Sequence, residues 1–189
     1  MAQSPQDGPG CGRSGLILGK FMPLTLGHCY LIDTALAQVD KLTVLVCTLR
    51  REPIDGHLRY QWVRATYPPE IYPQCKVVHV TDEVPSYPHE HSDFWSIWKS
   101  LILRYVPDVD VVFTSEEYGD KLASVLGCRH VCVDIHRHKV PISATRVRAD
   151  PLLNWEYIPP AVQPYYSAHL QPEARSHSSL PARPGSTQE

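Results

Sequence analysis

Five short runs of β-branched and other apolar residues recur along the chain, and stretches of helical period separate them. The runs are GLIL at 15–18, LTVLVC at 42–47, KVVHV at 76–80, VDVVF at 109–113 and HVCVD at 130–134. Each run is typical of a strand that is buried on both faces. Because strands alternate with helices, the pattern predicts a single α/β domain with a doubly wound parallel sheet of five strands.

The segments between these runs have helical spacing. Apolar side chains recur between Leu31 and Val39, and a cleaner stripe runs from Phe94 to Tyr105. Weaker helices are predicted at 57–67 and 116–126. In a doubly wound sheet, ligands bind beyond the carboxyl ends of the strands, where the strand order reverses. We therefore expect the ligand site directly after the first strand.

Both ends of the chain are rich in small and polar residues and in proline. Such segments cannot bury enough apolar surface to offset chain entropy. We therefore expect disordered tails at 1–14 and 169–189 and one folded domain at 15–168. The whole chain of 189 residues, with 43% hydrophobic and 20% charged residues, has the composition of an ordinary single domain.

Net charge and hydropathy argue against two classes of partner, nucleic acids and membranes. A net charge of -2 and a pI near 6.5 argue against a nucleic-acid partner held by a basic face. The longest apolar runs are far shorter than the roughly 18 to 20 residues that cross a bilayer, so no membrane partner is expected. The first residues do not have the pattern of a secretion signal, and we expect a cytoplasmic protein with reduced thiols.

Cysteine and histidine gather in one segment, at Cys128, His130, Cys132, His136 and His138. Such side chains could hold zinc, but the CxxC knuckle of closed zinc sites is missing. Buried strand cysteines are the alternative that we favour, and we predict no metal site built from side chains of this protein.

The segment after the first strand, GKFMPLTLGH at 19–28, has the residues of an anion site. Gly19 permits a close backbone approach, and Pro23 stiffens the turn. Gly27 and His28 stand at the start of a helix, where free amides and the helix dipole favour phosphate. A plain strand-to-helix turn is the alternative.

A second segment, PISATRVR at 141–148, has a similar character. Ser143 is suited to cap a helix, and the amides of the next turn are free to hold an anion. Thr145 and Arg148 add a hydroxyl and a guanidinium that suit phosphate oxygens. We expect Arg146 to face solvent.

These two segments resemble the GxFxPx(H/T)xGH and ISxTxxR motifs of the nucleotidyltransferase superfamily. Four further segments resemble the nicotinamide-mononucleotide (NMN) adenylyltransferase domain of NadR-type proteins. They are SYP at 86–88, the Trp-rich helix from Phe94, VDxxR at 133–137 and WEYIPPAVQPYY at 155–166. The resemblance covers roughly residues 15–167 and implies a Rossmann-like fold.

The resemblance implies transfer of AMP from ATP to NMN, which gives NAD and pyrophosphate, with Mg²⁺ entering with ATP. Three residues would be catalytic: His28 at the α-phosphate, Lys20 between the phosphates of both substrates, and Arg148 at the pyrophosphate. The residues expected to bind ATP are Gly19, Lys20, Phe21, Thr25, Gly27, His28, Ser143, Thr145 and Arg148. ATP and NMN are therefore the expected partners, and the sequence leaves a homo-oligomer open.

Thr25 departs from the commoner form of the motif, in which a histidine stands at this position. The phosphopantetheine adenylyltransferase branch resembles this chain in having TxGH. A hydroxyl cannot carry the positive charge of an imidazolium, so Thr25 would stabilise phosphate charge less. Two alternatives stay open: a nucleotidyltransferase acting on phosphopantetheine or glycerol phosphate, and a nucleotide-binding regulatory module without catalysis.

The nicotinamide would lie near the helix that begins FWSIW. A cationic pyridinium stacks well on an indole, and Trp95 lies off the core stripe formed by Phe94 and Trp98. The alternative is that both tryptophans belong to the core. By family position, Tyr87, Asp134 and Arg137 would complete the acceptor pocket.

A basic stretch follows the second strand. It comprises Arg50, Arg51, Arg59 and Arg64. These side chains could assist a substrate phosphate or form a solvated charged loop.

Overall fold

The computed structural model describes residues 13–170, and its sheet is the predicted one. The strands are β1 (Ser14–Gly19), β2 (Lys41–Cys47), β3 (Cys75–Val80), β4 (Val111–Thr114) and β5 (Arg129–Cys132). All neighbours pair in parallel in the order β3-β2-β1-β4-β5. The prediction of a doubly wound, parallel, five-stranded α/β domain is confirmed.

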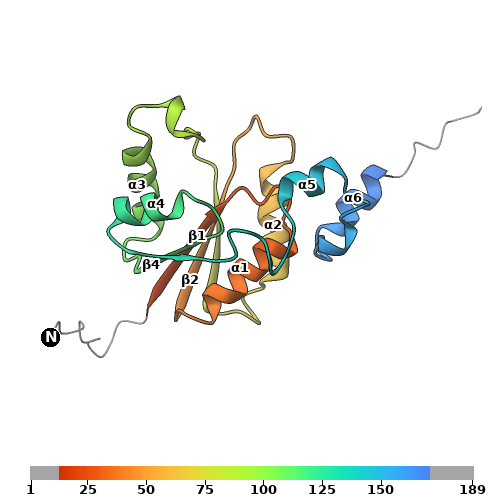
Figure 1. Ribbon diagram of the computed structural model, residues 1–189, viewed down its shortest axis with the longest axis horizontal. Coiled ribbons are helices and arrows are strands. Elements are labelled where there is room, and N and C mark those ends of the chain that lie inside the picture. Colours follow the sequence, from red (N-terminus) through yellow and green to blue (C-terminus); the bar gives the residue numbers. More distant parts are fainter. Residues whose placement is uncertain (1–12, 171–189) are drawn as a thin grey trace, which may run out of the picture.

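Helices cover both faces of this sheet (Figure 1). They are α1 (Leu26–Leu36), α2 (Gly56–Thr66), α3 (Phe94–Tyr105), α4 (Gly119–Leu126), α5 (Ala144–Ala149) and α6 (Gln163–Leu170), with short 3-10 turns at Pro88–Glu90 and Trp155–Tyr157. One core cluster joins the sheet to α1, α2, α5 and α6, and the other joins it to α3 and α4. Neighbouring strand residues divide between the clusters, as Leu16 and Ile17 do, because side chains alternate along a strand.

The predicted start of the first helix agrees with the structure: α1 begins at Leu26, beside Gly27 and His28, and Thr25 caps it. Two strand boundaries are corrected. Strand β4 begins at Val111 instead of 109. Strand β5 ends at Cys132 instead of 134, because Asp134 has a positive φ of 48°, which does not suit a strand.

The domain also extends slightly beyond the predicted limits of 15 and 168. Strand β1 begins at Ser14, and α6 continues to Leu170. The rest of the two predicted tails lies outside the described residues. Within residues 13–170, no helix is long and apolar enough to cross a membrane.

The strand order reverses at β1. The chain adds β2 and β3 on one side of β1 and then crosses over to add β4 and β5 on the other. The connections from β1 and β4 therefore diverge and leave a crevice at the carboxyl ends of these strands, which is where ligands bind in such sheets.

Candidate functional site

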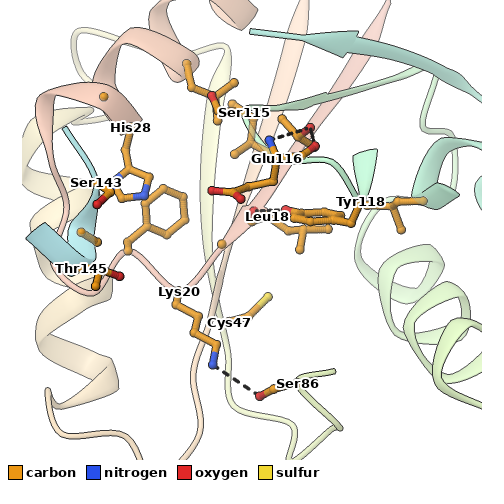
Figure 2. Close-up of a pocket in the computed structure, with 18 of the residues that line it drawn as sticks. Leu18, Lys20, His28, Cys47, Ser86, Ser115, Glu116, Tyr118, Ser143 and Thr145 are labelled. Carbon is orange, nitrogen blue, oxygen red and sulfur yellow. Dashed lines mark hydrogen bonds between the residues drawn. The ribbon is translucent and has the colours of Figure 1, made fainter. Parts of the chain in front are cut away.

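A cavity of about 520 Å³ occupies this crevice, and Figure 2 shows part of its lining. Nearly all the residues predicted for the site line it. They are Gly19, Lys20, Phe21, Thr25, Gly27, His28, Ser143 and Thr145 from the two motifs, and Tyr87, Trp95, Asp134 and Arg137 from the expected acceptor pocket. Among the predicted site residues, all of which the structure describes, only Arg148 does not line the cavity.

The loop after β1 wraps tightly around Phe21. This side chain is buried, and its ring centroid lies 5.0 Å from that of His28. Its backbone has a positive φ of 46°. A Cβ on Gly19 would lie 3.3 Å from the Phe21 ring, which is closer than most real Cβ contacts. Gly19 therefore leaves space for the aromatic side chain that supports His28.

Thr25 and His28 form a reciprocal cap at the start of α1. The Thr25 hydroxyl accepts a hydrogen bond from the His28 backbone N–H at 3.4 Å, and the Thr25 N–H donates to His28 Nδ1 at 3.1 Å. This is a capping box with histidine in the place usually held by Glu or Gln. The local sequence TLGH thus determines both where α1 begins and how the imidazole is held.

The environment of His28 keeps its ring uncharged. Burial and, to a lesser extent, the positive charge of Arg137 lower the pKa of His28 to about 4. At neutral pH the side chain can therefore donate one hydrogen bond to an anion, but it contributes no net positive charge.

Lys20 is tied to two other loops. Its Nζ lies 2.9 Å from Glu52 Oε1 and 3.4 Å from Ser86 Oγ, and it lies 5.7 Å from the centroid of the Tyr87 ring. Figure 2 shows the ammonium directed towards Ser86. Lys20 therefore joins the first motif to the loop that carries the predicted acceptor residues.

The fully buried side chain of Arg59 contacts both Lys20 and Glu52. Arg59 Nη1 donates to the Lys20 carbonyl at 2.9 Å, and Nη2 lies 2.7 Å from Glu52 Oε2. Burial raises the pKa of Glu52, but hydrogen bonds from the Leu49 N–H, Lys20 and Arg59 outweigh it and leave the pKa below its usual value. Arg59 is thus neither a solvated residue nor a free phosphate ligand.

The second motif begins as predicted. Ser143 caps α5 and accepts from the Arg146 N–H at 3.2 Å, while the Arg146 side chain is exposed. Arg148 donates to the Met22 carbonyl and, at 3.3 Å, to the Thr145 hydroxyl. Arg148 therefore fastens the second motif to the first one from outside the cavity.

Both tryptophans of α3, which covers the other face of the sheet from α1 and α5, line the cavity. Both are partly buried and pack against the core cluster, so the predicted contrast between an off-core Trp95 and a core Trp98 does not appear. Trp95 packs edge-on against Phe94. The Nε1 of Trp98 donates to the Pro85 carbonyl at 2.9 Å, a contact that helical spacing does not indicate.

Asp134 and Arg137 shape the loop between β5 and α5. The Asp134 carboxylate accepts from the backbone N–H groups of His138, Lys139 and Val140. Arg137 donates to Glu116 Oε1 at 3.1 Å and to the Ile142 carbonyl at 3.3 Å. Glu116, which sequence reasoning missed, therefore places a carboxylate beside the predicted substrate-binding arginine.

His130 from the cysteine–histidine segment has protein partners. Its Nε2 lies 2.8 Å from Thr114 Oγ1, and its Nδ1 lies 2.7 Å from Asp120 Oδ1. Across residues 13–170, no three His, Cys, Asp or Glu side chains stand close enough to hold a metal ion.

Comparison with known proteins adds to this geometry. No family model matches the chain. The chain is 29% identical over 170 residues to the trifunctional NAD biosynthesis/regulator protein NadR of Escherichia coli, and to that of Salmonella typhimurium. Each alignment covers 80% of this chain but only 40% of the relative, so the chain spans less than half the length of these proteins.

Solved structures share the fold. A NadR protein in complex with NAD and AMP-PNP superposes with a TM-score of 0.62 at 18% identity, over 81% of this chain and 46% of that one. A bifunctional NMN adenylyltransferase/ADP ribose pyrophosphatase from Francisella tularensis gives 0.61 at 12% identity, over 78% and 45%. These similarities confirm the predicted resemblance to a nucleotidyltransferase-like domain of NadR-type proteins with a Rossmann-like fold.

Proposed function

We propose that this protein is an NMN adenylyltransferase that transfers AMP from ATP to NMN and releases NAD and pyrophosphate. One observation carries the proposal: a cavity at the reversal of strand order is lined by the two phosphate-type motifs, which begin helices on one face of the sheet, and by the indoles of Trp95 and Trp98 from a helix on the other face. A nucleoside triphosphate and an aromatic mononucleotide would both find matching chemistry there. As the sequence predicts, we place the reaction in the cytoplasm.

The chemistry requires no general base. A phosphate monoester is already ionised at neutral pH, so an NMN phosphate oxygen can attack the α-phosphorus of ATP directly. A new P–O bond forms as the bond between the α-phosphorus and the bridging oxygen breaks, and pyrophosphate leaves with that electron pair. The protein then has to align the two nucleotides and stabilise the developing charge.

The residues of the two motifs suit these tasks. His28 would donate to an α-phosphate oxygen, and Lys20 would contact phosphates of both substrates. Ser143 and Thr145, with the amides at the start of α5, would hold the β- and γ-phosphates. Arg148 already holds the Thr145 hydroxyl, and direct contact with these phosphates would require it to release the Met22 carbonyl.

The acceptor end suits a pyridinium nucleotide. Trp95 has an indole on which the pyridinium ring can stack, and Tyr87 lines the cavity with 54% of its surface exposed. Arg137 can bind a phosphate once its hydrogen bond to Glu116 is broken. Names of the related structures are consistent with such a ligand, since one NadR protein is in complex with NAD and AMP-PNP and another with NR.

Mg²⁺ would enter with ATP. Four carboxylates line the cavity, namely Glu52, Asp82, Glu116 and Asp134, and each is engaged by another protein group. This donor set fits a metal ion held mainly by phosphate oxygens and water, as is common for Mg²⁺. When bound, the ion would neutralise charge on the departing pyrophosphate.

The proposal is tested by pyrophosphate release with ATP and Mg²⁺, with NMN, phosphopantetheine or glycerol phosphate as acceptor and with CTP as a second donor. We expect turnover with ATP and NMN and a matching yield of NAD. Faster turnover with another acceptor would identify a different nucleotidyltransferase. Tight binding of ATP without turnover on any acceptor would identify a regulatory module.

A further inference from the structure

We propose that Thr25 is a positioning residue: it holds His28 as a neutral imidazole whose Nε2–H serves the nucleotide, and it does not itself contact the triphosphate. The inference deepens the proposed function and rests on it for its kinetic consequences. Its structural part, the state of the His28 ring, stands on hydrogen bonds within the protein.

The backbone amide of Thr25 determines which ring nitrogen carries the proton. This N–H lies 3.1 Å from His28 Nδ1 and can only donate. Nδ1 must therefore be the unprotonated, accepting nitrogen. In a neutral imidazole the proton then resides on Nε2, which is the nitrogen available to a ligand.

The hydroxyl of Thr25 reinforces this assignment. Its oxygen accepts the His28 backbone N–H at 3.4 Å and lies 3.0 Å from Nδ1. Because Nδ1 accepts from the Thr25 N–H, the hydroxyl can approach Nδ1 only as a donor. The one proton of the hydroxyl is thus used within the capping box.

Burial argues against a direct phosphate contact. Thr25 is 1% exposed, and its hydroxyl oxygen already lies within hydrogen-bond distance of the His28 backbone N–H and of Nδ1. To reach a phosphate, the hydroxyl would have to abandon the cap of α1. His28 bears the only side chain of this pair that can serve the nucleotide without disturbing the helix.

The charges around the ring favour the same state. Phe21 covers the imidazole from the loop after β1, and Arg137 faces it from the loop after β5. Burial and the positive Arg137 lower the pKa of His28 to about 4, so the ring stays neutral at pH 7. Positive charge for the phosphates would come from Lys20 and Arg137.

The first test is nitrogen-15 NMR of the wild-type protein between pH 5.5 and 8. We expect an unprotonated Nδ1 and a protonated Nε2 for His28 throughout this range. A protonated Nδ1 at pH 7 would overturn the proposal. This measurement needs no substrate, so it gives an answer even if the protein transfers AMP to no acceptor and the proposed function fails.

The second test compares Thr25→Val, Thr25→Ser and the control Thr34→Val, which removes another α1 hydroxyl that bonds only the Tyr30 carbonyl. For Thr25→Val we expect kcat to fall at least tenfold, with a KM for ATP within about twofold of wild type, while the backbone amide of residue 25 keeps Nδ1 unprotonated. Thr25→Ser should restore most of kcat, and Thr34→Val should match wild type in kcat and KM. Melting curves show that the compared variants are folded.

A direct phosphate contact makes the opposite prediction. In that case Thr25→Val raises the KM for ATP about tenfold. That result, or a Thr25→Ser variant as impaired as Thr25→Val, would overturn the positioning role.

Discussion

Arg59 Nη2 lies 2.7 Å from Glu52 Oε2, and the arginine side chain is fully buried directly beneath the loop that carries Lys20. A buried charge pair of this kind adds little net stability, but it is costly to break because the remaining charge loses its partner. Its position beneath Lys20 indicates that it keeps the loop after β1 in place.

Removing the arginine should therefore destabilise the fold. Arg59→Met removes the cation at Glu52 Oε2 and leaves the buried carboxylate with Lys20 and the Leu49 N–H, and we expect a loss of about 3 to 5 kcal/mol in the free energy of unfolding. The double variant Arg59→Met/Glu52→Gln should regain part of that loss. Urea unfolding of Arg59→Met, Glu52→Gln and the double variant measures the coupling between the two side chains. If the stability losses of the two single variants simply add up in the double variant, the pair is not coupled.

His28→Ala should reduce adenylyl transfer by about 10²- to 10³-fold, because it removes a preorganised donor to the phosphate charge. His136→Ala is the matched control, since His136 is exposed and does not line the cavity. Steady-state kinetics with ATP and NMN, together with melting curves, measure both variants. A His28→Ala enzyme within tenfold of wild type would refute the catalytic role of His28.

The lowered pKa of His28 also predicts a stability change with pH. The folded ring takes up a proton only near pH 4, whereas the unfolded chain takes one up near 6.5. The protonated unfolded state is therefore favoured as the pH falls from 6.5 towards 4, and stability is lost over that window. Relative to His28→Asn, we expect wild type to lose at least about 1 kcal/mol by pH 4.5, since one pKa unit corresponds to about 1.4 kcal/mol. Parallel stability curves for the two proteins would count against a buried neutral ring.

Trp95 and Trp98 should differ in their effects. Trp95→Ala should raise the KM for NMN about fivefold to thirtyfold and leave that for ATP nearly unchanged, because stacking on a pyridinium contributes about 1 to 2 kcal/mol. Trp98→Ala also removes the hydrogen bond to Pro85 and should lower the melting temperature more. Both KM values and the melting temperature are measured for each variant. A large stability loss in Trp95→Ala without a selective effect on the KM for NMN would indicate that the nicotinamide stacks on Trp98 or Tyr87 instead.

Local sequence was enough to predict the sheet and the two helix starts. Strands buried on both faces require continuous apolar runs, so LTVLVC and the other runs identify themselves. The caps at Thr25 and Ser143 each join a side chain to an amide three residues further along. Such contacts depend only on neighbouring residues, and the motifs were therefore placed correctly at the carboxyl edge of the sheet.

The partners of these residues could not be predicted in the same way. Arg59 reaches the Lys20 carbonyl across 39 positions, and Arg148 reaches Met22 across 126. Even so, Arg59 stands three and four residues before the buried Trp62 and Val63, and this spacing on the core face of α2 was a signal of its burial.

The sequence by itself thus determined the α/β fold, the position of the crevice and the two segments, 19–28 and 141–148, that line it. Only the tertiary structure decided that Lys20 is held by Glu52, that Trp98 joins the cavity wall and that Arg148 lies behind Thr145. The physical reason is that helix and strand patterns arise from interactions a few residues apart. Side-chain partners across the crevice depend instead on how whole elements pack against the sheet.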